Sequence, residues 1–292
     1  MLAMSETFLT HRSGRWAKWA IALLIASAIG YWAEDLRVPP NGGSVFGYAS
    51  GTIAAFLMLV LTYLGRRKRH YGSRLGTVKG WTSAHVYFGL ALVILSLLHS
   101  GFQVGWNWHG LAFVLMFAVC LSGIYGVWAY QHYPALIDRN NLSQTRGALI
   151  DQLYSLDQDI TASLTRHDPR LASVVQGALE RTALPERWLD ILRGRDPSEV
   201  LLPSKGLVSN ANMTALIDYL IEQIEQGAQG DTALNLQSLV GALGERASLT
   251  SRIKEDLRLV TLTRIWLTIH IPLAFAAVVA VIIHVITVFL YW

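Results

Sequence analysis

Two apolar segments of this chain carry histidine pairs with the same spacing. In SAHVYFGLALVILSLLHSGF, His85 and His99 lie fourteen residues apart, and His270 and His284 repeat this spacing near the C-terminus. Fourteen residues of an α-helix make nearly four turns, so the two imidazoles emerge within about 40° of one face, about 21 Å apart along the axis. Each segment therefore predicts a helix that offers two imidazoles at two depths.

The two histidine helices are expected to cross a membrane in the same direction. His85 is then level with His270, and His99 is level with His284. Two facing imidazoles at one level are a ligand set for a haem iron, because iron binds imidazole well and a macrocycle fits between the helices of a bundle. The spacing predicts two haem b groups, one above the other, with these four histidines as iron ligands.

Intramembrane histidines have other uses. They can form polar contacts between helices or line a proton path, and two matched pairs favour this alternative less than a single histidine would. A dinuclear metal centre usually includes carboxylates at one level, and neither segment contains Asp or Glu. The single cysteine, Cys120, excludes a C-x-x-C-H haem attachment site and an iron–sulfur cluster held by this chain's thiolates alone.

Two glycines near the histidines are candidate cofactor contacts. Gly89 lies one turn from His85, and Gly101 lies just past His99. A glycine permits a flat ring to approach the backbone closely, but small residues are also ordinary choices for packing between membrane helices. Both interpretations stay open.

Charged and titratable residues near the predicted levels are candidates too. Arg264 lies about two turns before His270, where it can pair with a haem propionate. Lys79 and Arg74 can do the same or contact lipid headgroups. His109 opens the fourth apolar segment, where it can exchange protons at a quinol site, contact a propionate, or lie at the interface without chemistry.

The composition indicates an integral membrane protein. Only 15% of the 292 residues are charged, against about 25% in a soluble domain, and mean hydropathy is +0.36. No Asp, Glu, Lys or Arg occurs in 80–137 or 265–292, and roughly 20 apolar residues cross a bilayer. The first apolar segment, which contains IASA, resembles a signal peptide but is interpreted as a span. Five spans are predicted, at about 16–33, 45–64, 82–102, 109–130 and 260–290.

Basic residues predict the orientation of these spans. The stretch GRRKRHYGSRLGTVKG holds six Lys or Arg and no acid, and HRSGRWAK near the N-terminus is also basic. Cytoplasmic loops of membrane proteins carry such an excess. The N-terminus is therefore expected in the cytoplasm and the C-terminus outside, in a bacterial cytoplasmic (inner) membrane. The net charge of +4 is assigned to topology and contact with membrane lipid, not to nucleic-acid binding.

Residues 131–258 differ in character from the spans. Charges of both signs return, and stretches such as LASVVQGALERT and ANMTALIDYLIEQIEQ place apolar residues at helical spacing. The sequence predicts three parts. Residues 1–130 form membrane spans 1–4, residues 131–258 form a soluble, cytoplasmic, cofactor-free helical insertion that docks a partner, and residues 259–292 form a final span that completes the bundle.

The doubled histidine spacing resembles that of the two-haem cytochrome b of bc-type complexes. The wider layout is similar to bacterial cytochrome b and ferric-reductase-like membrane proteins, chiefly over the third, fourth and fifth spans. The four histidines align with the axial ligands of that family, and the resemblance implies transmembrane electron transfer. Five spans, an inserted domain and the absence of a P-E-W-Y motif depart from the bc-type pattern, so quinol bifurcation is not implied.

The expected function is that of a di-haem cytochrome subunit in a respiratory or electron-export system. It would pass electrons between the quinone pool and a partner redox protein, such as an iron–sulfur, flavin or multihaem cytochrome subunit. No nucleotide-binding motif occurs, so hydride transfer from NAD(P)H is not expected of this chain, and no catalytic residue is assigned. Two alternatives stay open: a self-contained transmembrane ferric or oxygen reductase, and a non-haem scaffold or transporter.

Overall fold

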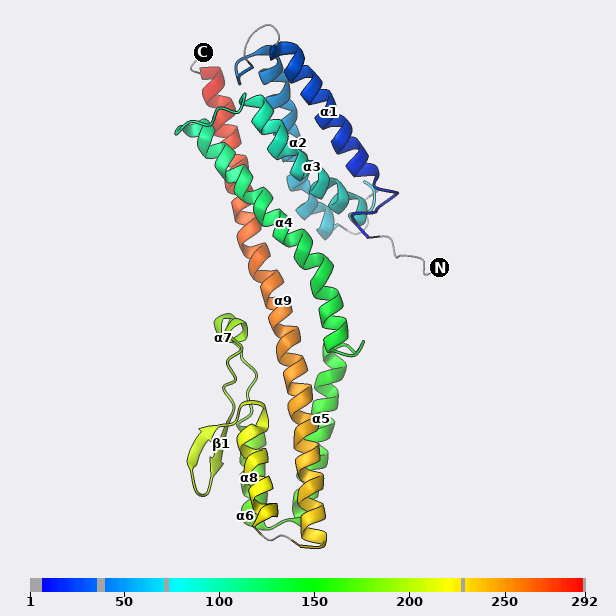
Figure 1. Ribbon diagram of the computed structural model, residues 1–292, viewed down its shortest axis with the longest axis vertical. Helices are drawn as coiled ribbons and strands as arrows, with labels where there is room; N and C mark the ends of the chain where they lie inside the picture. The colour runs from blue at the N-terminus through cyan, green and yellow to red at the C-terminus, as the bar shows by residue number, and fades with distance from the viewer. Residues whose placement is uncertain (1–6, 36–39, 71–73, 227–228, 291–292) are drawn as a thin grey trace. The chain divides into compact units, whose positions relative to one another are not determined.

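The computed structural model describes residues 7–35, 40–70, 74–226 and 229–290 (Figure 1). In these ranges five helices are long and apolar enough to span a membrane. The predicted class, an all-α membrane bundle with about five spans, is confirmed, and the chain is a multi-pass membrane protein. Loop residues 36–39 and 71–73, and Tyr291 and Trp292 of the predicted last span, lie outside the described residues.

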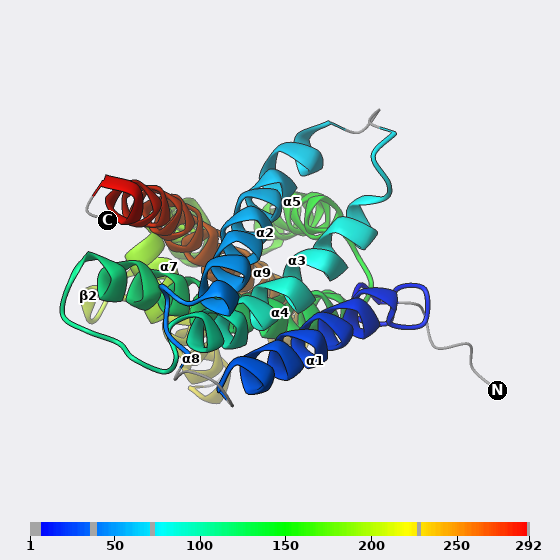
Figure 2. The same cartoon turned by 90° about the horizontal axis from the view of Figure 1, so that it is seen from above.

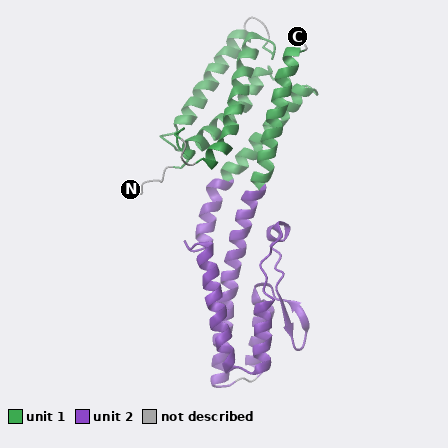
Figure 3. Cartoon of the chain, turned by 180° about the vertical axis from the view of Figure 1, so that it is seen from behind, with its two compact units in different colours: residues 1–128, 266–292 green, residues 129–265 purple. Residues whose placement is uncertain are grey.

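The chain divides into two compact units (Figure 3). Residues 1–128 and 266–292 form the first unit, and residues 129–265 form the second. The insertion predicted at 131–258 falls inside the second unit. The five long helices are α1 (Arg15–Asp35), α2 (Val45–Arg69), α3 (Val78–His99), α4 (Trp108–Asn140) and α9 (Asp231–Leu290), of which α4 and α9 contribute residues to both units.

The helices α4 and α9 extend well beyond the spans predicted at 109–130 and 260–290. The hydropathy of a segment marks the part that matches lipid, but it does not mark where a helix ends. Glu, Gln, Lys and Arg are good helix formers, so a helix can continue into a polar segment, and α4 does so past Pro134. The sequence therefore predicted where the apolar spans lie, and α4 and α9 contain these spans and continue past them.

Side-chain caps fix where α2 and α3 begin. The Ser44 hydroxyl accepts a hydrogen bond from the Gly47 amide at 3.0 Å, and the Thr77 hydroxyl accepts one from the Gly80 amide at 3.0 Å. Ser44 also donates to Glu34 near the end of α1 at 2.5 Å. Such caps satisfy amides that lack partners in the first turn of a helix. The hydrogen bond from Ser44 to Glu34 also joins the end of α1 to the start of α2.

The first three helices are neighbours in the membrane unit, as the view from above shows (Figure 2). α1 meets α2 where the Phe46 ring lies beside Gly30; a Cβ on that glycine would come within 2.9 Å of the ring. α1 meets α3 at the other end, where the rings of Trp16 and Phe88 have centroids 5.9 Å apart. Small residues at such crossings let membrane helices approach closely.

The second unit has a conventional apolar core. Leu216, Leu220 and Leu243 are fully buried together with Val175 and Val200. Its other elements are α5 (Arg146–Ser163), the 3-10 turns η1 (Leu164–Arg166) and η2 (Ala211–Met213), α6 (Pro169–Glu180), α7 (Trp188–Arg193), β1 (Glu199–Leu202), β2 (Gly206–Ser209) and α8 (Thr214–Glu225).

The hairpin of β1 and β2 was not predicted. Its antiparallel register pairs Val200 with Val208 and Leu201 with Leu207. Alternate residues of β1, Val200 and Leu202, are buried in the core. Four residues are too few for a period-2 pattern to stand out from the surrounding helical patterns.

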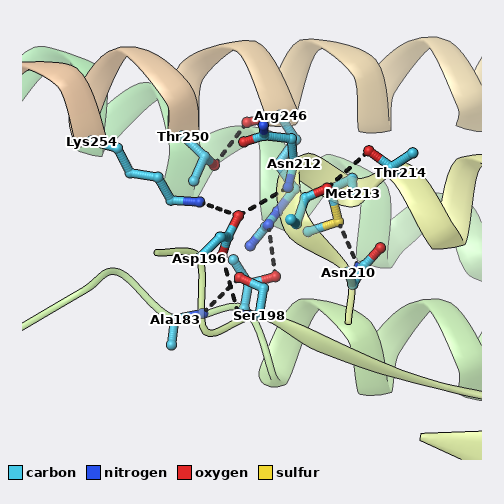
Figure 4. Close-up of polar contacts among 12 residues, drawn as sticks. Ala183, Asp196, Ser198, Asn210, Asn212, Met213, Thr214, Arg246, Thr250 and Lys254 are labelled. Atoms are coloured by element: carbon cyan, nitrogen blue, oxygen red, sulfur yellow. Dashed lines mark hydrogen bonds and ion pairs between the residues drawn. The ribbon is translucent and has the colours of Figure 1, made fainter. Parts of the chain in front are cut away.

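A half-buried carboxylate organises the loop before α8 (Figure 4). Asp196 accepts hydrogen bonds from the Lys254 ammonium at 2.5 Å and the Asn212 amide at 2.9 Å. Asn212 and Met213 both adopt left-handed backbone angles, with φ of 50° and 62°, which is unusual for Met. Burial would raise the pKa of Asp196, but hydrogen bonds from Lys254, Ser198 and Asn212 outweigh it and lower the pKa to about 2.

This depressed pKa predicts how acid affects the second unit. Asp196 stabilises the fold above its ordinary pKa of 3.8, and this contribution is lost as the pH falls towards about 2. The Asp196→Asn variant should melt at a lower temperature than the wild type at pH 7, with a smaller further loss between pH 4 and pH 2. Thermal unfolding of the purified protein in detergent measures both effects.

The matched control is Asp218→Asn, since Asp218 is exposed. It should follow the wild-type pH profile. An Asp196→Asn profile parallel to that of the wild type would contradict the assignment.

Candidate functional site

The structure brings the four predicted ligands together as two pairs. The rings of His85 on α3 and His270 on α9 have centroids 6.4 Å apart and an angle of 66° between their planes. At a second level, the rings of His99 and His284 have centroids 6.0 Å apart at an angle of 83°. All four residues are half-buried. The membrane unit therefore holds two cross-helix imidazole pairs.

The separation within each pair matches that of two ligands on one metal. A metal–imidazole bond is about 2 Å long, and a ring nitrogen lies roughly 1 Å from the ring centre, so opposed ligands have centroids roughly 6 Å apart. Among the described residues, no group of three or more His, Cys, Asp or Glu is placed to hold a metal ion. A haem iron needs only two axial ligands from the protein, because the macrocycle supplies the rest. The two pairs fit haem.

Backbone carbonyls of α2 orient both histidines of α3. His85 Nδ1 lies 3.1 Å from the Leu61 carbonyl oxygen, and His99 Nδ1 lies 2.7 Å from the Gly47 carbonyl oxygen. A carbonyl only accepts, so each Nδ1 carries the proton, and Nε2 keeps the lone pair that binds a metal. Leu61 and Gly47 are themselves fourteen residues apart. Metal-bound histidines commonly have such a second hydrogen bond, which fixes the ring.

Side chains of α4 contact the rings of both histidines of α9. His270 Nδ1 lies 3.0 Å from the Ser122 hydroxyl. The Trp266 indole donates to the Ser122 carbonyl at 2.8 Å, and its ring lies beside His270 with centroids 5.1 Å apart. The Nδ1 atoms of His284 and His109 are in contact. In both pairs, every histidine ring thus makes its hydrogen bond through Nδ1.

His109 therefore lies against a predicted ligand. Its ring centroid is 4.5 Å from that of His284, with the planes nearly perpendicular. The sequence proposed quinol or propionate contact, or no chemistry, for this residue. The structure adds a contact that the sequence did not predict, between His109 Nδ1 and His284 Nδ1. His109 is exposed.

Two glycines unnoticed in the sequence make room for aromatic rings. A Cβ on Gly51 would lie 2.6 Å from His99 Cε1, and a Cβ on Gly126 would lie 2.0 Å from the Trp266 ring. Both distances are shorter than contacts between unbonded atoms. Glycine at these positions seats His99 against α2 and Trp266 against α4.

The two predicted glycines have different surroundings. Nothing lies within 4 Å of a Cβ built on Gly89, and its carbonyl receives the Cys120 thiol at 3.3 Å. The open space one turn from His85 fits a flat ring. Gly101 has φ of +60°, and a Cβ there would be 2.1 Å from the Pro40 carbonyl oxygen. The backbone conformation and this close approach account for Gly101 without any cofactor.

An apolar cluster lies between the two levels. Leu92 and Ala277 each stand halfway between the histidines of their own helix, and both are buried. They pack with Met58 and Leu61 of α2 and Met116 of α4. The cluster fills the space between the two pairs with side chains that offer no hydrogen bonds to water.

The basic residues predicted as possible partners of a haem propionate lie in different parts of the structure. Arg264 belongs to the second unit and is exposed. Lys68, in the last turn of α2, lies close enough to His85 to interact with it electrostatically. Lys68 is thus a further candidate partner for an anionic group at the His85–His270 level, beside Lys79 and Arg74.

Several functional contacts were missed in the sequence. A backbone carbonyl such as that of Leu61 has no sequence signature at all. Ser122 had a weak signal, as a polar side chain within an apolar span. Gly47 and Gly51 had a stronger sequence signal, because two glycines four residues apart commonly mark close helix packing in membranes.

No protein-family model, curated protein or solved structure matches this chain. The family resemblance therefore rests on the spacing of the histidines.

The seating of His99 predicts different effects for one substitution at two positions of α2. Gly51→Ala should force the His99 ring away from the Gly47 carbonyl and lower the unfolding free energy by about 1–3 kcal/mol, the usual cost of overpacking. Gly65→Ala should be neutral or slightly stabilising, since nothing lies within 4 Å of its Cβ. Melting temperatures of the two purified variants make the comparison, and equal shifts would contradict the packing described.

Proposed function

We propose that this protein is a di-haem b-type membrane cytochrome that carries electrons across the membrane between the quinone pool and a partner redox protein. The observation that carries the proposal is the geometry of the imidazole pairs, with centroids 6.4 Å and 6.0 Å apart. Each ring has its hydrogen bond at Nδ1, the arrangement expected of iron ligands. Chance polar contacts between helices have no reason to recur at both levels.

The protein's own contribution is to hold and shield the ligands. When bound, haem supplies reversible one-electron chemistry at its iron. The α2 carbonyls keep the imidazoles of His85 and His99 in the metal-binding tautomer, and Ser122 helps to fix the His270 ring. Leu92 and Ala277 keep water out of the space between the levels, and a dry, low-dielectric surrounding tunes the potential of a bound cofactor.

The proposed orientation follows the distribution of basic residues. The last turn of α2 contains Arg66, Arg67, Lys68 and Arg69, and such clusters lie on the cytoplasmic side. The N-terminus and residues 131–258 then face the cytoplasm of a bacterial cell, and the C-terminus faces outward. The His85–His270 pair is the cytoplasmic level in this orientation.

The second unit is proposed to dock the partner redox protein. Leu201 and Leu207 face each other across the hairpin and are 51% and 55% exposed. Trp188, at the start of α7, is also 55% exposed. Exposed apolar side chains on a water-facing surface, such as the Leu201–Leu207 pair, are typical of protein contact sites.

The proposal predicts that both levels are needed for transfer across the membrane. His99→Ala should remove one haem spectral component and abolish reduction of an acceptor outside, at least about 100-fold. It should leave the other component reducible from the cytoplasmic side. The measurement uses sealed vesicles of known orientation with an impermeant acceptor, and His167→Ala in the second unit serves as the control.

A retained wild-type rate in His99→Ala would contradict a transmembrane path. Retention of both spectral components in this variant would contradict the assignment of His99 as a ligand.

A further inference from the structure

A groove of about 820 Å³ opens between α1 and α2, next to α3. Its walls are apolar and largely aromatic: Trp16 and Trp19 come from α1, Phe56 from α2 and Phe88 from α3. Trp19 and Phe56 are 59% and 65% exposed. This volume lies in the range of small-molecule sites, roughly 300–1,000 Å³.

One end of the groove is strongly basic. A second hollow of about 480 Å³ shares Arg15, Trp19 and Ala22 with the groove and adds Arg12 and Lys18. Among the residues that the structure describes, no acidic side chain lines either hollow. Arg15 and Lys18 are one turn apart at the beginning of α1, where an apolar span meets the polar boundary. Basic side chains thus lie at one end of the apolar groove.

We propose that this groove binds an anionic glycerophospholipid, with an acyl chain between α1 and α2 and the phosphate at Arg15 and Lys18. The apolar walls match a hydrocarbon chain, and the cations match a charged headgroup at the membrane boundary. Arg15 forms a fork of donors suited to phosphate oxygens. A neutral isoprenoid quinone would match the walls but has no anionic group for Arg15 and Lys18 to bind. The site is independent of haem binding.

The test is binding of defined lipids to the full chain in detergent. Native mass spectrometry should record retained phosphatidylglycerol in preference to phosphatidylcholine with the same acyl chains. The Arg15→Gln/Lys18→Gln double variant should bind phosphatidylglycerol about 25-fold more weakly, since each cation near an anionic surface contributes roughly five-fold in affinity. Ala22→Phe, which narrows both hollows, should weaken it too, and glycerol phosphate without acyl chains should not compete.

The matched control is Arg66→Gln/Arg69→Gln, which removes the same charge from exposed positions of α2 outside the groove. It should change binding less than two-fold. An equal loss in both double variants would overturn the proposal in favour of general attraction to anionic surfaces. Equal binding of the two lipids by the wild type would overturn it as well. Haem spectra should be unchanged in every variant, so this result is separate from the proposed function.

Discussion

An imidazole at the depth of the hydrocarbon must find its hydrogen-bond partner inside the protein, because lipid offers none. In this chain a neighbouring helix supplies each partner. α2 gives carbonyls to both histidines of α3, and α4 gives Ser122 and His109 to the histidines of α9. The same four contacts set the rotation of the helices about their axes. The pairing of the rings depends on them.

The two units reach their packing by different means. In the second unit, burial of Leu216, Leu220 and Leu243 removes large apolar side chains from water, which drives folding directly. In the membrane unit, lipid is as apolar as leucine, so close fit matters more than burial. Gly51 and Ala277 are small where a ring or a helix must approach. A methyl group added at Gly51 is therefore expected to lower the free energy of unfolding more than its small volume suggests.

The membrane spans and the paired histidines could be predicted from the sequence, because hydropathy and helical periodicity are local properties. His85 and His99 share a helix face whatever surrounds them. The partners of these rings could not be predicted, since the Leu61 and Gly47 carbonyls are backbone groups brought close by tertiary packing. Gly101 was assigned a possible cofactor contact, whereas its positive φ and its contact with Pro40 explain it. The hairpin was missed because its strands are too short to show a period.

The amount of haem bound by the purified chain tests the central claim most directly. Four oriented imidazoles in two pairs predict about two haems b per chain, released by acidic acetone because no thioether bond holds them. A pyridine haemochrome assay on protein of known concentration measures this ratio. A ratio near two agrees with the account. A colourless protein, or one haem per chain, would contradict it.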